Sequence, residues 1–406
     1  MEGEGNVRDK GEDVTDCLSE EEFASYIAAA GGRLYVVGGY VRDLFLGKLS
    51  HDRDYVVTGL TTEAFEAMFA QIVAIGKAFS VYRMCIDGAF VDVAMARREH
   101  RQGVGHTAFS VISDGSVTLF EDLKRRDFTV NAMAIDVVTG QLFDPFHGKV
   151  DAVQKKLRAV SPAFREDPLR VYRAARFCCE LAFTIDKETF CMMRSMRRDL
   201  AHLSVERVFE ECHRAMLTSD PIRFFTMLNH AGVLSEHFPE IVQLSDDYEQ
   251  WQEIQRAVTW MVQNSSESFM RFAAIAYALP LLDKRSLYLR LKFPKLWQQA
   301  LEFVSSDQAY FDYGTREFAK HIETVLSHMK RSIFGMKRYC TVMEAIATAQ
   351  GNGRAAFYTS LPQRCEEIER EVRAAGFAAS MRPELRSGYL RTQIEDRLFT
   401  AIKMML

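Results

Sequence analysis

The sequence lacks the features that direct a chain into a membrane or an oxidising compartment. It contains no apolar run of transmembrane length and shows no signal-peptide pattern at its N-terminus. Its eight cysteines are scattered and include no C-x-x-C pair, which fits reduced thiols better than disulfides or a zinc site. We therefore expect a cytoplasmic protein with a reduced core and no membrane partner.

An excess of charge of one sign is also missing. The 51 lysines and arginines nearly balance the 55 aspartates and glutamates, which leaves a formal net charge of −4. This balance neither demands nor excludes a nucleic-acid partner, because binding RNA needs a local basic surface rather than a basic chain. A hydrophobic content of 48% is ordinary for globular protein, and 406 residues are enough for two or three domains.

Proline and glycine signals divide the chain into parts of different character. Residues 1–32 are an acidic extension that ends in a short helix. From residue 33 to residue 160 strand-like runs dominate, with a tight hairpin expected at Asp87-Gly88 and a strand over residues 129–138. Beyond Ser161-Pro162 the pattern is helical, and several of the nine prolines fall between helical segments, where they stop helices. The sequence predicts an α+β fold, a small α/β head followed by an all-helical remainder.

The stretch from Leu34 to Val57 carries the first candidate site. A short apolar strand runs into Gly38-Gly39, and the next strand opens with Asp52 and Asp54. Alternate residues of a strand project from the same face, so both carboxylates point one way. They repel each other unless divalent cations lie between them. This pattern suggests metal-assisted phosphoryl or nucleotidyl transfer, and the alternative is a pair of solvated carboxylates.

A third carboxylate belongs to Asp92, which lies inside the apolar run from Phe90 to Ala94. A charged side chain in such a run needs a partner or a metal. If the hairpin at Asp87-Gly88 lies beside the first strands, Asp92 completes a three-carboxylate, two-metal site. Such a site activates an attacking hydroxyl and stabilises a departing pyrophosphate.

A basic cluster from Lys124 to Asn131 is the second constellation. Arg126 suits the negative charge of a triphosphate, whereas Asp127 and Asn131 suit the edge of a sugar. The cluster runs straight into an expected strand, so the alternative is a solvated strand entry.

The third constellation lies at the start of a predicted helix, between Glu166 and Arg176. Pro168 falls in the first turn, where proline is tolerated. Asp167 and Arg170 are three residues apart and share a helix face, so they could match the edge of a base with acceptors and a planar fork of donors. The alternative is an intrahelical ion pair. Arg173 is the next step round the face, and Arg176 has drifted about half a turn from Asp167.

In this order and spacing, the motifs resemble those of the bacterial CCA-adding tRNA nucleotidyltransferases, the class II group that also contains bacterial poly(A) polymerase. The resemblance runs without a large gap from about residue 34 to about residue 240. The segments that carry it are Gly38–Asp43, Asp52–Asp54, Arg125–Ala134, Asp144–Asp151 and Glu166–Arg170.

The resemblance implies an architecture, a reaction and a set of site residues. Residues 33–160 would be a polymerase-β-like nucleotidyltransferase head, residues 161–220 a helical neck with the nucleotide-selecting helix, and residues 221–406 a tRNA-binding body and tail. The tRNA 3′-hydroxyl would attack the α-phosphate of CTP and then of ATP, with loss of pyrophosphate, and add C, C and A without a nucleic-acid template. Asp52 and Asp54 would bind Mg²⁺, with Asp92 as the third acid. The residues expected to bind the nucleotide are Gly39, Arg42, Arg126, Asp127, Asn131, Asp167, Arg170, Arg173 and Arg176.

The segment Arg97–Thr107 matches the flexible loop that in this family helps the switch from CTP to ATP. Relatives that add only the two cytidines are shortened here, so its presence favours full CCA addition. The alternative is an ordinary mobile loop with two glycines.

The chain departs from the family in three places. Tyr277 and Ala278 stand where many relatives carry a His-Asp dipeptide that binds metal, so we expect no phosphohydrolase activity. The N-terminal extension has no functional counterpart that the sequence explains. His147 occupies a turn in which many relatives have a glycine or a small residue.

The helical half contains basic groups that could contact RNA. Between Lys284 and Lys295 they interleave with aromatic residues, and a second set extends from Lys330 to Arg338. Such a mixture could hold a phosphate backbone, and the alternative is a solvated face. The interleaved aromatic residues are Tyr288, Phe293 and Trp297.

Two other functions remain open. A poly(A) polymerase of the same family would share every catalytic residue, but it usually carries a strongly basic C-terminal tail, which residues 393–406 do not form. A catalytically inactive RNA-binding relative would have no need of clustered carboxylates, so Asp52, Asp54 and Asp92 argue against it.

Overall fold

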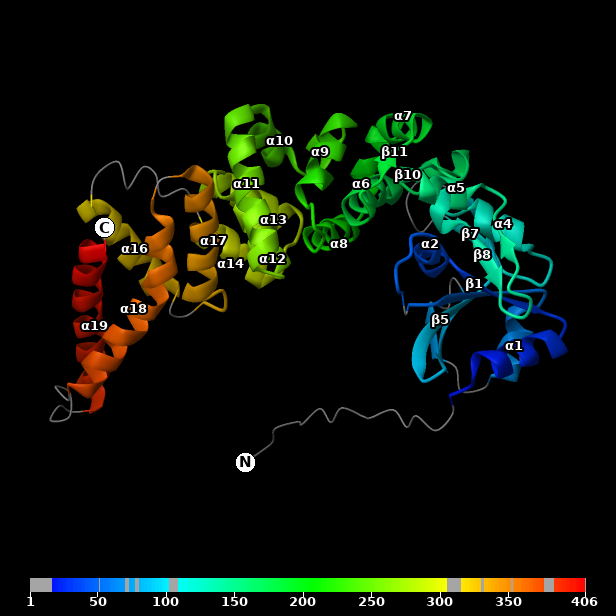
Figure 1. Cartoon of the computed structure of the whole chain (residues 1–406), viewed down its shortest axis with the longest axis horizontal. Helices are drawn as coiled ribbons and strands as arrows, with labels where there is room; N and C mark the ends of the chain where they lie inside the picture. The colour runs from blue at the N-terminus through cyan, green and yellow to red at the C-terminus, as the bar shows by residue number, and fades with distance from the viewer. Residues whose placement is uncertain are drawn as a thin grey trace. The chain divides into compact units, whose positions relative to one another are not determined.

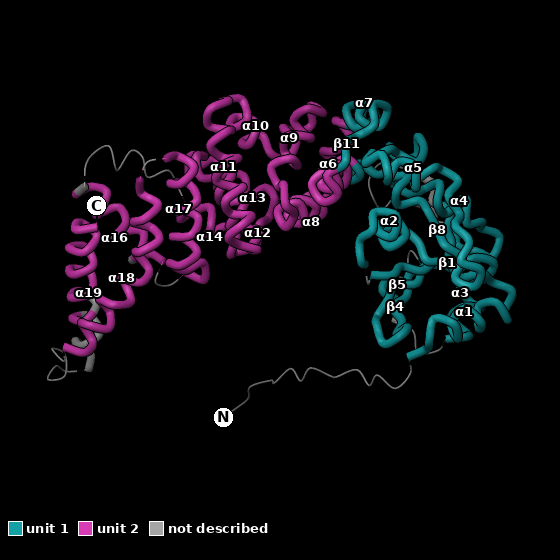
Figure 2. The backbone as a smooth tube through the Cα atoms, viewed as in Figure 1, with its two compact units in different colours: residues 1–170, 183–196 teal, residues 171–182, 197–406 magenta. Residues whose placement is uncertain are grey.

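The chain folds into two compact units, which are described separately (Figure 2). Unit 1 contains residues 1–170 and 183–196, and unit 2 contains residues 171–182 and 197–406. The division falls inside a helix near residue 170 rather than at residue 160, where the sequence pattern changes. The computed structural model (Figure 1) describes residues 17–50, 52–69, 73–76, 80–101, 109–304, 315–329, 332–351, 353–375 and 383–405.

Within the described residues, unit 1 is built around a seven-stranded sheet with the strand order β3-β4-β5-β2-β1-β8-β9. β2 and β5 pair in parallel, whereas the other neighbours in this sheet pair antiparallel. The order places β1 and β2 in the interior of the sheet. The strands are β1 (Arg33–Val37), β2 (Asp54–Thr58), β3 (Val73–Gly76), β4 (Val81–Ile86), β5 (Ala89–Met95), β8 (Ala134–Asp136) and β9 (Leu142–Phe143).

The hairpin predicted between β4 and β5 is confirmed. Asp87 and Gly88 both have positive φ angles, 51° and 77°, as a two-residue turn of the mirror-image type requires. Glycine adopts such angles without steric cost because it has no Cβ. The turn brings Asp92 of β5 next to β2, as the sequence analysis assumed.

Helices cover both faces of the sheet because its strands present apolar side chains alternately on each face. On one face α1 (Glu20–Ala29) and α3 (Thr62–Met68) bury an aromatic cluster, in which the ring of Phe65 lies 5.1 Å from Tyr82 and 6.5 Å from Phe23. The other face packs against α4 (Leu119–Lys124). The short helix expected at the end of the extension is α1.

The strand predicted over residues 129–138 is only partly right. Its first residues form the 3-10 turn η3 (Thr129–Asn131), and only β8 is extended. The hydroxyl of Thr129 donates to Asp151 at 2.8 Å, and its carbonyl lies where a Cβ on Gly148 would come within 2.1 Å. The chain bends here because of these tertiary contacts, which an apolar pattern does not reveal.

His147 adopts the left-handed conformation, with φ 60° and ψ 32°, directly before α5 (Gly148–Val153). A positive φ angle strains a residue that has a Cβ. His147, which stands where many relatives have a glycine or a small residue, therefore lies in a strained turn. The remaining elements of unit 1 are α2 (Gly39–Phe45), β6 (Arg98–Arg101), β7 (Phe109–Ile112), β10 (Lys156–Leu157), η4 (Pro162–Glu166), β11 (Thr184–Ile185) and α7 (Lys187–Ser195).

The elements of unit 2 in its described ranges are all helices, which turns and loops connect. Aromatic rings fill part of its core. The ring of Phe272 lies 6.0 Å from Phe225, 5.3 Å from Phe293 and 5.4 Å from Trp297. No helix in the part of the chain that the structure describes is long and apolar enough to cross a membrane. The helices are α6 (Leu169–Leu181, which begins in unit 1), η5 (Arg197–His202), α8 (Val205–Met216), α9 (Ile222–His230), η6 (Leu234–Glu236), α10 (Pro239–Asp246), α11 (Tyr248–Asn264), α12 (Ser268–Ala276), α13 (Leu281–Arg290), α14 (Lys295–Phe303), α16 (Thr315–Met329), α17 (Met336–Gln350), α18 (Ala355–Ala374) and α19 (Pro383–Met405).

The expectation of reduced thiols throughout is wrong for one pair of cysteines. Cys17 and Cys85 form a disulfide, with their Cα atoms 4.8 Å apart. Leu18 forms an isolated bridge with Ile86, which brings the two cysteines together although 68 positions separate them in the chain. The other six cysteines are free thiols.

Candidate active site

The three predicted acidic residues meet at one end of β2. Asp54 is the first residue of this strand and pairs in register with Val37 on one side and with Asp92 on the other. Register partners on parallel strands project from the same face, so the carboxyl groups of Asp54 and Asp92 share a face. Asp52 precedes Asp54 by two residues along the chain.

The charges of these residues affect one another. Asp54 is accessible to solvent, yet its pKa is raised to about 6. Partial burial is the largest cause, the negative charges of Asp52 and Asp92 add to it, and the positive charge of Arg126 lowers the pKa. A further positive charge beside Asp54 would lower its pKa again, as the charge of Arg126 already does.

Asp92 has a partner of opposite charge on the neighbouring strand. One oxygen of Asp92 accepts hydrogen bonds from Arg83 on β4, from Nε at 3.1 Å and from Nη2 at 3.0 Å. Among the described residues, no three histidine, cysteine, aspartate or glutamate side chains lie close enough together to hold a metal ion. The partner of Asp92 in this structure is therefore Arg83, and its expected role as the third acid beside Asp52 and Asp54 stays a prediction.

The pair of residues Asp52 and Asp54 fits the coordination of Mg²⁺. This ion is usually held by one or two carboxylates, with water and substrate phosphates as its other ligands, rather than by an all-protein cage. The carboxylate of Asp54 lies among negative charges that a divalent cation would neutralise. Asp52 and Asp54 are the residues that would hold the ion.

The glycine turn between β1 and α2 lies beside Asp54. Gly38 has a φ angle of 74°, and a Cβ on it would lie 3.4 Å from Nη1 of Arg126 and 3.9 Å from Oδ2 of Asp54. A Cβ here would make ordinary contacts with both charged groups, and the positive φ angle is what favours glycine at this turn. Three separate motifs of the sequence, the Gly38-Gly39 turn, the aspartate pair and Arg126, converge at this point.

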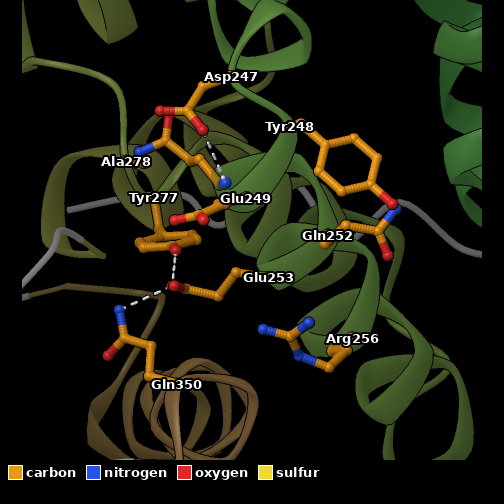
Figure 3. Close-up of a pocket in the computed structure, with 10 residues that line it drawn as sticks. Asp247, Tyr248, Glu249, Gln252, Glu253, Arg256, Tyr277, Ala278 and Gln350 are labelled. Atoms are coloured by element: carbon orange, nitrogen blue, oxygen red, sulfur yellow. Dashed lines mark hydrogen bonds between the residues drawn. The ribbon is translucent and has the colours of Figure 1, made fainter.

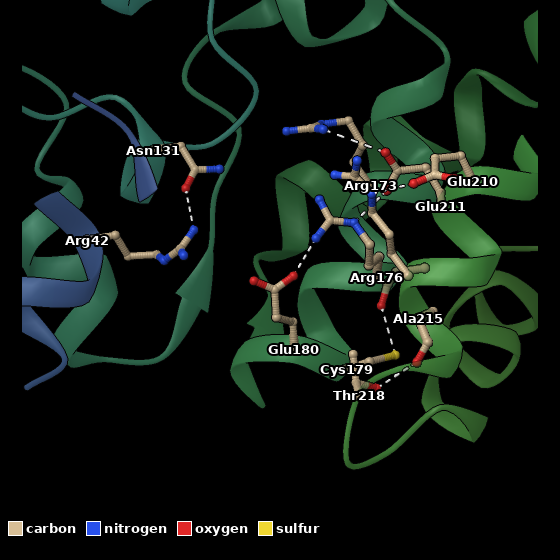
Figure 4. A network of polar contacts seen from close by, with 12 residues as sticks. Arg42, Asn131, Arg173, Arg176, Cys179, Glu180, Glu210, Glu211, Ala215 and Thr218 are labelled. Atoms are coloured by element: carbon tan, nitrogen blue, oxygen red, sulfur yellow. Dashed lines mark hydrogen bonds and ion pairs between the residues drawn. The ribbon is translucent and has the colours of Figure 1, made fainter. Parts of the chain in front are cut away.

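Arg42, Asn131 and Asp127 form a buried network behind the turn. Nη1 of Arg42 donates to Oδ1 of Asn131 at 2.8 Å (Figure 4), and Nδ2 of Asn131 donates to Oδ1 of Asp127 at 3.2 Å. Arg42 also pairs with Asp43 at 2.9 Å. These side chains connect α2 to η3, and the nucleotide-binding role assigned to them stays a prediction.

One residue of the site was missed by the sequence reasoning. Asp122 of α4 is fully buried, and its carboxylate accepts from Nη2 of Arg125 at 2.5 Å and from Nη2 of Arg126 at 3.1 Å. Burial by itself raises the pKa of Asp122, but the two arginines outweigh it and lower the pKa to about 2. Asp122 thereby orients Arg126, and its spacing of three and four residues from the arginines was the available signal.

The predicted flexible loop is connected to the same carboxylate. The backbone N–H of Arg97 donates to Asp122 at 3.3 Å, and the carbonyl of Arg97 accepts from Nε of Arg125 at 3.1 Å. β6 follows, and residues 102–107 of the predicted loop lie outside the described residues. Its expected role in the switch between nucleotides stays a prediction.

Asp167 and Arg170 lie at the start of α6. Oδ1 of Asp167 accepts from the N–H of Leu169 at 3.1 Å, which caps the helix. Nη1 of Arg170 donates to the carbonyl of Ala163 at 2.8 Å, and Nη2 to the carbonyl of Arg125 at 2.5 Å. Arg170 is therefore held in a fixed orientation and is linked to the segment that carries Arg126.

Arg173 and Arg176 belong to unit 2 and are already engaged there (Figure 4). Arg176 is 5% exposed and forms ion pairs with Glu180 and Glu211, the latter at 2.6 Å. Arg173 contacts the same Glu211 at 3.6 Å. The structure gives Arg176 a role in fixing α6 against α8, and the nucleotide-binding role of both arginines stays a prediction.

Tyr277 and Ala278, which stand in place of the His-Asp dipeptide, belong to a polar pocket of unit 2 with a volume of about 770 Å³ (Figure 3). Tyr277 and Ala278 line it, and no histidine is among its lining residues. The hydroxyl of Tyr277 donates to Glu253, which also accepts from Nε2 of Gln350 at 2.8 Å. The side chain of Tyr277, which stands at the position of the histidine, is thus hydrogen-bonded to another protein side chain.

Several basic groups of the helical half contact other protein groups, whereas Arg285, Lys292, Lys295 and Lys337 are exposed, and RNA contact by this set stays a prediction. Lys284 is buried and donates to two backbone carbonyls, while Arg290 pairs with Glu240 at 2.5 Å. Arg338 pairs with Glu267 at 2.6 Å. Lys330 and Arg331 lie outside the described residues, and the interleaved rings of Tyr288, Phe293 and Trp297 are buried in the core.

The comparisons with known proteins agree with this geometry. Residues 34–158 match the family described as the poly A polymerase head domain, and residues 182–244 match the family described as a probable RNA and SrmB-binding site of polymerase A. The first match spans the sheet, the glycine turn and the aspartate pair. Residues 34–158 of unit 1 are therefore similar to a poly A polymerase head domain, in agreement with the resemblance found in the motifs.

Curated relatives make the resemblance more specific. The chain is 44% identical over 215 residues to the multifunctional CCA protein of Shewanella denitrificans and 45% identical over 218 residues to that of Vibrio parahaemolyticus. It is 44% identical over 214 residues to the CCA-adding enzyme of Alteromonas mediterranea. These alignments cover 52% of this chain and 51–53% of the relatives. The chain thus spans about half the length of the curated relatives it matches.

Solved structures extend the likeness of fold to most of the chain. A Bacillus stearothermophilus CCA-adding enzyme in complex with CTP has a TM-score of 0.65 at 22% identity and covers 94% of this chain and 95% of its own. A CCA-adding enzyme with ATP has a TM-score of 0.68 at 19% identity, covering 93% and 88%. At these identities the likeness shows the fold alone, an α+β nucleotidyltransferase fold.

Proposed function

We propose that the protein adds C, C and A to the 3′ end of tRNA from CTP and ATP, with Mg²⁺ as its metal and without a nucleic-acid template. The observation that carries the proposal is the convergence of the Gly38-Gly39 turn, Arg126 and the aspartate pair at one end of β2. The names of the relatives, CCA proteins and CCA-adding enzymes, support the choice of reaction. We infer that the reaction takes place in the cytoplasm, where tRNA is processed.

The chain's own residues provide orientation and charge for this reaction. Arg126, fixed by Asp122, would neutralise the triphosphate beside the glycine turn. Asp167 and Arg170 would present one acceptor group and one donor group to the base edge, which selects the nucleotide without a template strand. When bound to Asp52 and Asp54, Mg²⁺ would supply the positive charge that polarises the α-phosphate and activates the attacking hydroxyl.

The test is a tRNA that lacks its CCA end, incubated with the purified protein, CTP, ATP and Mg²⁺. We expect extension by three nucleotides, by two when ATP is left out, and none when CTP is left out. A long run of adenylates would identify a poly(A) polymerase instead, and no extension with retained tRNA binding would identify an inactive RNA-binding relative.

We also propose that unit 2 has no phosphohydrolase activity, because Tyr277 and Ala278 supply neither an imidazole nor a carboxylate to a metal. The test is hydrolysis of bis-p-nitrophenyl phosphate with Ni²⁺ or Mg²⁺ added. We expect a rate no higher than that of the buffer and metal alone, and a metal-dependent rate above it would contradict the proposal.

A further inference from the structure

The N-terminal segment contacts the aspartate motif through its central residue. Arg53 lies between Asp52 and Asp54, and its Nη1 donates to Oε1 of Glu20, the first residue of α1, at 2.9 Å. The same glutamate oxygen accepts from the hydroxyl of Tyr55 at 2.6 Å. A residue outside the matched head domain, which begins at residue 34, therefore anchors the strand that carries the predicted metal ligands.

Arg53 also reaches the helix that follows the glycine turn. Its Nη2 donates to the hydroxyl of Tyr40 at 3.2 Å, and its guanidinium lies 5.0 Å from the centre of the Tyr40 ring. Tyr40 directly follows Gly39 in the chain. The contacts Glu20–Arg53–Tyr40 thus join α1, the aspartate motif and the glycine turn, and we call these three residues the Arg53 clamp.

Glu20 is itself held in place by contacts that do not involve Arg53. Its N–H donates to Oδ1 of Asp87 at 3.1 Å, and the preceding Ser19 caps α1 in a reciprocal arrangement with Glu22. The N–H of Asp87 donates to the carbonyl of Leu18 at 2.9 Å. Glu20 is therefore a fixed point on the β4–β5 hairpin against which Arg53 is oriented.

The geometry of an extended chain explains why this matters for the aspartates. Neighbouring side chains of a strand leave it in opposite directions, so Glu20, which accepts from Tyr55 of β2 and from Arg53 directly before this strand, contacts the side opposite to the carboxylate of Asp54. Holding Arg53 fixes the backbone from which both carboxylates project. An ion pair of similar exposure elsewhere on the surface would add little to stability.

We propose that Glu20 is a positioning residue, which acts through Arg53 to hold Asp52 and Asp54 in place for a divalent cation beside the glycine turn. The proposal depends on the metal-binding role of these aspartates in the proposed function. It gives the N-terminal segment a role that the sequence did not explain.

The test measures Mn²⁺ binding to the nucleotide-free protein by electron paramagnetic resonance, which requires no turnover. We expect Glu20→Ala to raise the Kd for Mn²⁺ about 10-fold. This is the lower end of the range seen when a residue that supports metal ligands, without binding the metal itself, is replaced. The matched control is Glu21→Ala, which removes an exposed acid from the same first turn of α1 and should leave the Kd within about twofold of wild type. Glu20→Gln keeps an acceptor for Arg53 and should give an intermediate Kd.

A double-mutant cycle with Arg53→Met shows whether Glu20 acts through Arg53. We expect that adding Glu20→Ala to Arg53→Met weakens Mn²⁺ binding no further, while thermal unfolding shows that all variants are folded. A wild-type Kd in Glu20→Ala, or equal losses in both backgrounds, would overturn the proposal. Normal Mn²⁺ binding by a wild-type protein that extends no tRNA would overturn the proposed function and leave the clamp intact.

Discussion

Asp122 organises more of the candidate site than any aspartate that the motifs single out. Its buried carboxylate holds Arg125 and Arg126 and accepts from the backbone of Arg97. The carbonyl of Arg125 in turn accepts from Arg170. At the scale of single residues, one carboxylate therefore connects the predicted triphosphate site, the predicted loop and the predicted base-reading helix.

This geometry predicts a strong effect of Asp122→Asn on stability. The amide leaves two arginines without the charge that compensates them, so we expect a loss of about 3 kcal/mol in the free energy of unfolding at pH 7, measured in urea. Because folding lowers the pKa of Asp122 to about 2, its contribution is complete above its unfolded pKa and disappears as the pH falls towards 2. The difference between wild type and variant should therefore narrow below about pH 4. The control is Asp246→Asn at an exposed position, and an equal loss in both variants would contradict the account.

A second substitution separates the two roles of Asp167. Asp167→Ser keeps a side-chain acceptor for the N–H of Leu169, and serine caps helices well, so thermal stability should change by less than about 1 kcal/mol. Without the carboxylate, we expect kcat/KM for CTP and ATP to fall at least about 10-fold and the relative incorporation of UTP and GTP to rise. Steady-state kinetics with each nucleotide measures this. An unchanged preference among the four nucleotides would mean that Asp167 is a helix cap only.

At the scale of elements, the sequence pattern predicted features that depend on a few neighbouring residues, such as a tight turn. The Asp87-Gly88 hairpin follows from backbone rules over a few residues, whereas β2 begins only at Asp54, so the common face expected for Asp52 and Asp54 stays a prediction. The contacts between segments did not follow from such rules: Asp92 is paired with Arg83, which lies across the β4–β5 hairpin, and η3 bends where Gly148 approaches it. Both depend on how elements pack, which a single sequence pattern does not encode.

The Cys17–Cys85 disulfide is the clearest case of this limit. Nothing in the spacing of the cysteines indicates it, because the pairing depends on Leu18 lying beside the end of β4. Closing a loop of this length restricts the unfolded chain, so we expect the oxidised protein to be more stable than the reduced one by about 2–4 kcal/mol. Urea unfolding with and without reductant measures the difference, with Cys85→Ser as the control that should not respond. Equal stability of the oxidised and reduced wild type would show that the disulfide does not stabilise the fold.

At the scale of the whole molecule, the two units carry different amounts of functional information. The motifs that resemble the CCA-adding enzymes lie in unit 1 and in the first helices of unit 2, and the curated relatives match over about half of their length. Of the basic residues considered for RNA contact in unit 2, Lys284, Arg290 and Arg338 are engaged within the unit. The sequence therefore yields a proposal for the chemistry from named motifs, whereas it indicates no surface for the proposed tRNA substrate with the same precision.

The central claim is that Asp52 and Asp54 bind the metal for CCA addition. The most direct measurement is single-turnover extension of a tRNA lacking CCA by wild type and by Asp52→Ala, together with the tRNA affinity of both proteins. We predict three added nucleotides for wild type, at least about a 100-fold slower extension for Asp52→Ala, and the same tRNA affinity for both. Extension by Asp52→Ala at the wild-type rate would contradict the account.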